Sequence, residues 1–174
     1  MRVISGSARG KNLESLEGLS TRPTIDRVKE GIFSSIQFLV PGARVLDLFA
    51  GTGAVGFEFA SRGAASVTSV EINAVHYNFI RTTAKSFGLT NIHPVKANVF
   101  LYLKSCAKKY DIIFSDAPYD LEGSEQVVDM VLENGLLKED GIFIFEHSKD
   151  KDFSQHPRFS RLRSYGSVQF SIFE

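Results

Sequence analysis

The fold is decided by Val45-Leu46-Asp47-Leu48-Phe49-Ala50-Gly51-Thr52-Gly53-Ala54-Val55-Gly56, an apolar run that leads into closely spaced glycines. The apolar half is typical of a strand that is buried on both faces in a parallel sheet. The second half has the G-x-G-x-x-G spacing of the turn between a strand and a helix in Rossmann-like folds. We therefore expect a strand that ends near Leu48 and a helix that begins near Gly53.

The sequence beyond this stretch continues the alternation of strand and helix. Further helices are expected to begin near Asn73, Asn98 and Glu122. Alternation of this kind indicates an α/β fold with a mainly parallel sheet. The expected strands are rich in β-branched and aromatic residues, with little polar alternation, and comprise Arg44–Leu48, Ser66–Glu71, Ile92–Lys96, Asp111–Ser115 and Gly141–Glu146.

The C-terminal part departs from this alternation. Phe159–Ser164 and Val168–Phe173 are too close in sequence for a parallel crossover, so they predict an antiparallel addition to the sheet. A chain of 174 residues favours one domain with a single core. We expect a single domain over residues 1–174, in which residues 1–23 form an extension of the core at residues 24–174.

The N-terminal part departs from it as well. Val3–Ile4 and Asn12–Leu13 flank a small glycine-containing turn and predict a short β-hairpin. A helix is expected over Ile25–Val40, with Thr24 as its N-cap and Pro41-Gly42 as its end.

Composition excludes several classes of protein. The net charge is zero, which argues against a protein that coats nucleic acid by bulk charge, although Arg2, Arg9 and Lys11 form a local basic group without an acid. No apolar run approaches the roughly 20 residues of a membrane span, so no membrane partner is expected. A single cysteine, Cys106, fits a reducing cytoplasm. No spacing typical of metal ligands is present, and no metal is expected.

Two acids bear on the ligand of the glycine turn. Glu71 lies twenty residues after Gly51, where an acid that binds ribose hydroxyls belongs. Asp47 precedes the turn by four residues, and a carboxylate there opposes the pyrophosphate of a dinucleotide by roughly 2–3 kcal/mol per pair of charges ~6 Å apart. S-adenosylmethionine carries an ammonium and a sulfonium and no phosphate, so the two acids favour it. A nicotinamide-dependent oxidoreductase remains an alternative.

Further residues are expected to contact this cofactor. They lie in the glycine turn or directly after a strand. Asn98 follows the strand Ile92–Lys96 and offers an amide oxygen to the adenine amine, although it is equally suited to be a helix N-cap. The other expected cofactor contacts are Phe49, Gly51, Gly53, Ile72 and Asp116.

A second strand end, Asp116-Ala117-Pro118-Tyr119, is suited to a nucleobase that carries an amine. The Asp116 carboxylate and the Ala117 carbonyl can accept hydrogen bonds from the amine and so free its lone pair to attack a methyl carbon. Pro118 restricts the backbone and removes one donor. The Tyr119 ring can stack on the base, a contact worth about 1–3 kcal/mol. We take these four residues as the candidate catalytic group.

At these residues the chain resembles a known group. Asp116-Ala117-Pro118-Tyr119 is similar to the Asp/Asn-Pro-Pro-Tyr/Phe motif of class I amino-methyltransferases that act on nucleic acids. Nearly the whole chain resembles the bacterial small-subunit ribosomal RNA guanine-N2 methyltransferases. The matching stretches are Arg2–Gly6, Thr21–Glu30, Val45–Gly56, Ser61–Ala64 and Tyr165-Gly166.

The resemblance implies a Rossmann-like class I methyltransferase fold with seven strands, an antiparallel final strand and helices on both faces. It implies S-adenosylmethionine as donor and a guanine of small-subunit ribosomal RNA, free or in an assembling 30S particle, as acceptor. It also implies that the N-terminal hairpin holds RNA, which makes Arg2, Arg9, Lys11 and Arg22 candidate RNA contacts. Ala117 departs from the motif, which has proline there. A non-catalytic RNA-binding module of the same fold remains a further alternative.

Overall fold

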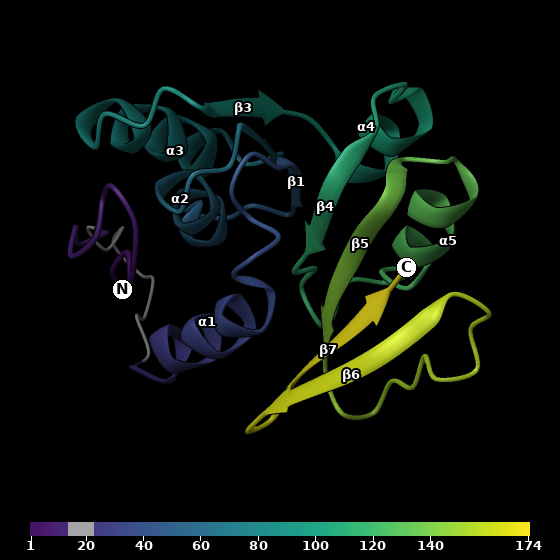
Figure 1. The fold of residues 1–174 in the computed structure, drawn as a ribbon. Coiled ribbons are helices and arrows are strands. Elements are labelled where there is room, and N and C mark those ends of the chain that lie inside the picture. The colour runs from purple at the N-terminus through teal and green to yellow at the C-terminus, as the bar shows by residue number, and fades with distance from the viewer. Residues whose placement is uncertain (14–22) are drawn as a thin grey trace.

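The computed structural model describes residues 1–13 and 23–174, which form a seven-stranded sheet covered by helices (Figure 1). The strand order is β3-β2-β1-β4-β5-β7-β6. The strands are β1 (Arg44–Leu48), β2 (Ser66–Glu71), β3 (Ile92–Lys96), β4 (Tyr110–Ser115), β5 (Leu137–His147), β6 (Phe159–Tyr165) and β7 (Val168–Phe173). The first five are parallel, and β7 is antiparallel to both of its neighbours. The expected parallel sheet with an antiparallel final strand is therefore confirmed.

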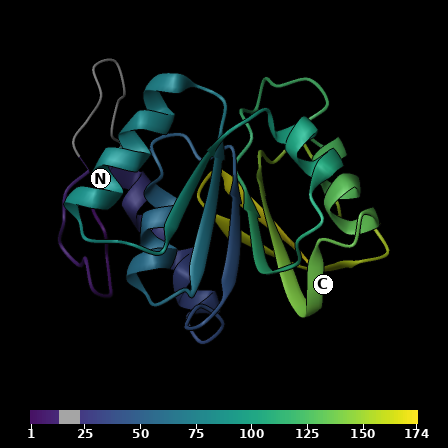
Figure 2. The ribbon, with the colours of Figure 1, turned by 90° about the horizontal axis from the view of Figure 1, so that it is seen from above.

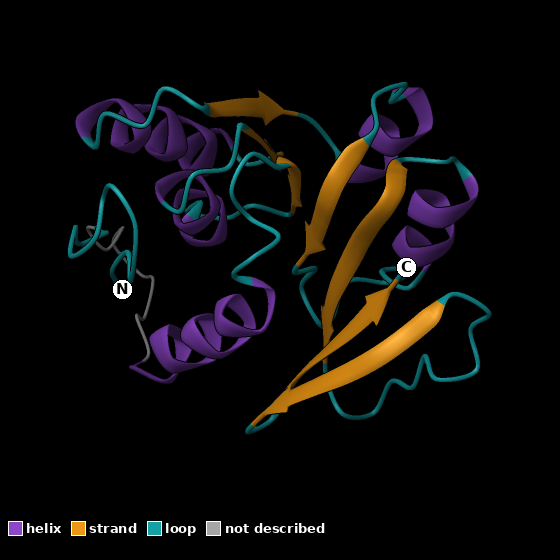
Figure 3. Ribbon diagram, viewed as in Figure 1, coloured by secondary structure: helices purple, strands orange, loops and turns teal. Residues whose placement is uncertain are grey.

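Helices lie on both faces of the sheet (Figures 1 and 3). They are α1 (Pro23–Ile36), α2 (Ala54–Ser61), α3 (Ala74–Ser86), α4 (Val99–Ser105) and α5 (Gln126–Glu133). The helices α1 to α3 share one buried core with the sheet, and α4 and α5 share the other. Figure 2 shows the two groups separated by the strands. Because both faces are covered, the strands carry apolar residues almost without alternation.

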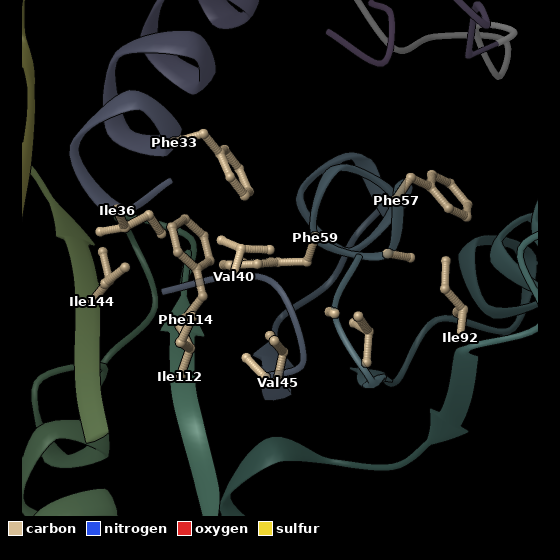
Figure 4. Close-up of a cluster of buried hydrophobic side chains, with 14 of the residues drawn as sticks. Phe33, Ile36, Val40, Val45, Phe57, Phe59, Ile92, Ile112, Phe114 and Ile144 are labelled. Atoms are coloured by element: carbon tan, nitrogen blue, oxygen red, sulfur yellow. The ribbon is translucent and has the colours of Figure 1, made fainter. Parts of the chain in front are cut away.

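The core beneath α1 and α2 is rich in aromatic rings (Figure 4). Phe33 of α1 meets Phe59 of α2 edge to face, with ring centroids 4.6 Å apart. Val45 of β1 and Phe114 of β4 lie in the same core. Packing of this kind fixes α1 and α2 against the strands whose carboxyl ends form the site.

Two helices differ from their predicted bounds. The helix α1 ends at Ile36, four residues before Val40, and the chain then forms a turn in which the Leu39 N–H donates to the Ile36 carbonyl. The helix α5 begins at Gln126, because residues 118–124 form successive turns and Gly123 has a φ of +78°. A positive φ is incompatible with a right-handed helix, so no helix starts at Glu122.

The N-terminal segment is only partly as predicted. Residues 1–13 turn back on themselves through antiparallel backbone hydrogen bonds, but they form one bridge, Arg2 to Asn12, and no strand. The segment is also bound to α2. Glu58 of α2 is fully buried and accepts from the N–H groups of Ile4 (2.9 Å) and Ser5 (3.1 Å). The expected hairpin is therefore present as one antiparallel bridge rather than two full strands, and the side chain of Glu58 holds its turn.

The same carboxylate holds two cations. Glu58 lies 2.8 Å from Nε of Arg62 and 3.3 Å from Nζ of Lys29. Lys29, on α1, also donates to the carbonyl of Arg2 at 2.7 Å. One buried carboxylate thus joins α1, α2 and the N-terminal segment.

Candidate active site

The candidate site lies where the carboxyl ends of the parallel strands meet. Asp47 is on β1 and Glu71 ends β2, whereas Asp116 and Glu146 lie at the ends of β4 and β5. Ser115 is in register with Phe145, so Asp116 and Glu146 follow on adjacent strands. In open α/β sheets ligands bind at this edge, where the strand order changes direction. Here that place is between β1 and β4.

The glycine turn brings α2 close to the strands. Gly53 has a φ of +85° and is the residue directly before α2. A Cβ at Gly56 would lie 2.9 Å from Oγ of Ser69 and 3.2 Å from Oδ2 of Asp47, so only glycine lets α2 approach these strands so closely. Gly51 and Phe49 also have positive φ values, of +58° and +56°. The predicted turn is confirmed.

Asp47 is a buried acid with an unused oxygen. Its side chain is buried beneath the start of α2, and among the described residues its Oδ2 has no hydrogen-bond partner. Burial raises the pKa of Asp47 well above its usual range, and the charges of Asp116 and Glu71 raise it further, against one backbone N–H from Gly56. A cationic ligand group would relieve this excess of negative charge.

Glu71 holds the glycine turn in place. Its Oε1 accepts from the N–H of Gly51 and its Oε2 from the N–H of Asn73, both at 2.8 Å. A carboxylate has about four acceptor sites, so each oxygen can accept another hydrogen bond. The structure therefore gives Glu71 a part in shaping the turn and leaves acceptor capacity for two ligand hydroxyls.

The remaining predicted cofactor residues lie around this turn. Asn98 caps α4, and its side-chain oxygen accepts from the Leu101 N–H at 3.2 Å. Ile72 is 59% exposed, which is unusual for an isoleucine and leaves an apolar surface for a flat ring. Phe49 packs edge to face on Phe100, with centroids 6.3 Å apart. Asn98 thus has the capping function that the sequence also allowed, and its contact with adenine stays a prediction.

Residues 116–119 leave β4 as the motif predicts. Ala117 is buried, whereas Pro118 is exposed and Tyr119 is half exposed. Asp116 lies at the rim with part of its surface exposed, but the protein around its carboxyl removes hydration and raises its pKa, against a hydrogen bond from Glu146. Desolvation and the charges of Glu146 and Asp116 raise the pKa of Tyr119 to about 12. The Tyr119 hydroxyl is therefore neutral near pH 7.

Glu146 is the site residue that the sequence did not single out. It is the penultimate residue of β5 and lies next to Asp116, and it lines a small pocket together with Ala117, Tyr119 and Lys151. Burial raises the pKa of Glu146 to about 10, with further contributions from the charge of Asp116 and the hydrogen bond to it. In the sequence, its position near the end of a strand is only a weak indication of a role in the site, because the sequence does not show which strand lies beside β5.

The predicted RNA residues are placed in part. Arg2, Arg9 and Lys11 are exposed on the N-terminal segment. Arg22 and Thr21 lie outside the described residues. The expected N-cap at Thr24 is wrong, because α1 already begins at Pro23 and Thr24 is its second residue.

The acidic side chains of the site fit S-adenosylmethionine as the ligand. The orphaned Oδ2 of Asp47 can accept a cationic group, and Glu71 can accept ribose hydroxyls. A dinucleotide would instead bring two phosphate charges toward Asp47, Glu71 and Asp116. The sheet order and this set of side chains define a class I methyltransferase that uses S-adenosylmethionine.

Comparison with known proteins gives the family. The chain belongs to the family described as "Conserved hypothetical protein 95", whose model matches residues 1–174. It is similar to "Putative rRNA methyltransferase YlbH" of Bacillus subtilis, with 34% identity over 100% of this chain and 98% of the relative. It is also 29% identical to "Ribosomal RNA small subunit methyltransferase D" of Escherichia coli K12, over 100% of this chain and 89% of the relative.

A solved structure shares the fold over nearly its whole length. "Putative methyltransferase yhhF" from Escherichia coli superposes with a TM-score of 0.88 at 28% identity, over 99% of this chain and 96% of that one. Within residues 1–13 and 23–174, no helix is long and apolar enough to cross a membrane. The same residues contain no group of three or more side chains that could hold a metal ion.

Proposed function

We propose that this protein transfers the methyl group of S-adenosylmethionine to the exocyclic N2 of a guanine in small-subunit ribosomal RNA. The observation that carries the proposal is the position of Asp116 and Tyr119, an acceptor and an aromatic ring, at the strand end next to Asp47. The acceptor groups suit the two N–H donors of an aromatic amine. Similarity to rRNA methyltransferases over the full chain supports an RNA substrate.

The chemistry assigned to the strand end concerns the lone pair on N2. That lone pair is delocalised into the guanine ring, which makes the nitrogen a poor nucleophile. Hydrogen bonds from the amine to the Asp116 carboxylate and the Ala117 carbonyl favour a tetrahedral nitrogen with a free lone pair. Stacking on Tyr119, worth about 1–3 kcal/mol, holds the ring in place. Most of the acceleration is assigned to proximity and orientation.

The cofactor residues bind and orient the methyl donor. When bound, the cofactor would supply a methyl carbon on a positively charged sulfur; the transfer moves the positive charge from sulfur to N2, which then releases one proton. Asp47 neutralises the positive end of the donor, and Glu71 accepts its ribose hydroxyls. Ile72, Phe49 and Asn98 border the adenine. The methylated amine is acidic, so no strong base is required to remove its proton.

The RNA is proposed to contact the N-terminal segment as well as the site. Arg2, Arg9 and Lys11 are exposed there, and Glu58 anchors the segment to α2. Arg22 is assigned to the same function from the resemblance. Since the net charge of the chain is zero, a structured target such as an assembling 30S particle is favoured over free RNA.

A methyl-transfer assay tests the proposal. Labelled S-adenosylmethionine is incubated with small-subunit RNA or with 30S particles from cells that lack the protein, and digested nucleosides are identified by mass spectrometry. We expect N2-methylguanosine, and Asp116→Ala should lower turnover at least about tenfold while S-adenosylhomocysteine still binds. Calorimetry that showed binding of NAD and no binding of S-adenosylhomocysteine would contradict the proposal. Unchanged turnover of Asp116→Ala would contradict the role assigned to Asp116.

A further inference from the structure

The carboxyl group of Glu146 lies directly beside that of Asp116. The parallel pairing of β4 and β5 places Ser115 opposite Phe145, and the next residue on each chain segment is an acid, Asp116 after β4 and Glu146 within β5. The two carboxyls share a hydrogen bond, which is possible only when one of them carries a proton. Two carboxylates in such contact do not both ionise near neutral pH.

The surroundings determine which carboxyl keeps the proton. Burial, the Asp116 charge and the shared hydrogen bond raise the pKa of Glu146 to about 10. Burial also raises the pKa of Asp116, but there the same hydrogen bond opposes the rise. Glu146 therefore holds the shared proton more tightly than Asp116 does. Because the pair titrates as a unit, its apparent values belong to both residues.

No described cation neutralises the pair. The ammonium of Lys151 lines the neighbouring pocket but bonds to the loop before α5, to Ser124 at 3.0 Å and Glu125 at 3.2 Å. Phe170 of β7 is opposite Glu146 in the antiparallel pairing and has no charge.

The other titratable neighbours do not supply a positive charge either. Tyr119 approaches from the loop after β4 and is neutral at pH 7. His147, next along β5, is buried, and desolvation lowers its pKa, so the ring is neutral. Its two nitrogens bond to Ser148 and Ser171.

We propose that Glu146 is a positioning residue for methyl transfer, which as a neutral acid donates a hydrogen bond to Asp116 and holds that carboxylate ionised and oriented toward the amine. Asp116 then keeps its remaining acceptor sites for the two N–H donors of the base. Without this donor, the Asp116 side chain can rotate and would take up a proton more readily. The inference rests on the proposed function and adds to it a residue that does not touch the base.

Three variants test the role of Glu146. Glu146→Gln keeps a side chain of equal length with an N–H donor and removes the ionisable group. Glu146→Ala removes the donor. Asp120→Ala removes an exposed carboxylate from the loop after β4 and serves as the matched control. Turnover is measured at saturating donor and 30S particles from pH 7 to pH 10.5, and S-adenosylhomocysteine affinity and melting temperature are recorded for each.

The expected pattern separates positioning from a structural role. Glu146→Ala should lower turnover at least about tenfold with unchanged S-adenosylhomocysteine affinity, Glu146→Gln should restore most of it, and the control should resemble the wild type. The wild type should lose turnover as the pH rises through the pKa of Glu146, about 10, because a second negative charge then adjoins Asp116. Glu146→Gln should not show this alkaline loss.

Each failure has its own meaning. Wild-type turnover in Glu146→Ala, or the same alkaline loss in Glu146→Gln as in the wild type, would overturn the inference and leave the proposed function intact. If the wild type forms no N2-methylguanosine on any small-subunit substrate, the proposed function fails and the inference with it. If Glu146→Ala does not fold, the alkaline limb of Glu146→Gln alone decides.

Discussion

Replacing Asp47 by asparagine should stabilise the cofactor-free protein while it weakens cofactor binding. Asp47 is 1% exposed, and its Oδ2 has no partner among the described residues. Asparagine has the same shape without the charge, and its amide can donate to the hydroxyl of Ser69, which is in register across the β1–β2 pair and is also buried without a partner. A buried unsatisfied group costs about 1–3 kcal/mol, so we expect a gain of that size in the free energy of unfolding.

The gain should depend on pH in a defined direction. Burial raises the pKa of Asp47 in the folded protein above the usual value of 3.8. The folded state thus keeps a proton that the unfolded chain releases, and the stability due to Asp47 is fully present below pH 3.8. It is lost as the pH rises through the raised folded-state pKa. The advantage of Asp47→Asn should therefore grow with pH and be largest near neutrality.

Urea denaturation from pH 4 to pH 8, without cofactor, measures this effect. Asp111→Asn is the matched control, because Asp111 on β4 accepts from the Arg44 N–H at 2.8 Å and from Nζ of Lys138 at 3.3 Å and should lose stability, by at most about 1 kcal/mol. Calorimetry should show at least about tenfold weaker binding of S-adenosylhomocysteine to Asp47→Asn. The reasoning is refuted if Asp47→Asn is less stable than the wild type at pH 7, or if its affinity for S-adenosylhomocysteine is unchanged.

Three further predictions concern the N-terminal segment. Changing Arg9 and Lys11 to alanine should weaken RNA binding and flatten its dependence on salt, and equal salt slopes in filter binding would mean that the segment has only a structural role. Gly6→Ala should cost at least about 2 kcal/mol by denaturation, because φ is +91° and a Cβ would lie 1.9 Å from a backbone carbonyl oxygen of α2. Gly10 has a φ of +81° with open space around it, so Gly10→Ala should cost less. Equal losses of stability in Gly6→Ala and Gly10→Ala would contradict the clash. Glu58→Gln should cost about 3–5 kcal/mol and expose the segment to protease, because it leaves the buried ammonium of Lys29 without a counter-charge. A loss below about 1 kcal/mol would show that the ion pairs are dispensable.

Most of the sheet could be predicted because the residue pattern that indicates each strand lies within that strand and its flanking turns. The bounds of β1, β2, β3 and β7 were predicted as they stand, since each is a short β-branched or aromatic run bounded by turn residues. The start of β5 at Leu137 was missed by four residues. Leu137 pairs with Tyr110 ahead of an irregularity in the pairing, and that contact between distant segments leaves no local pattern.

The anchoring of the N-terminal hairpin to α2 could not be predicted, for a different physical reason. The basic turn of residues 1–13 looks like an isolated hairpin, but its backbone N–H groups bond to the side chain of Glu58 on α2. In sequence, Glu58 is an ordinary acid in a helix and gives no sign of full burial. The tertiary contact supplies acceptors for the N–H groups of Ile4 and Ser5, which the backbone of the hairpin leaves unpaired.

The sequence by itself determined the class of fold, the glycine turn and three acids of the site, Asp47, Glu71 and Asp116. Glycine spacing and strand ends are local properties, and parallel strands necessarily bring Asp47, Glu71 and Asp116 to one edge. Only the tertiary structure decided that Glu146 adjoins Asp116, because the strand order that sets β5 beside β4 depends on packing across the whole sheet. Only it decided the protonation of that pair, since the pKa of a carboxyl depends on its burial and on the charges around it.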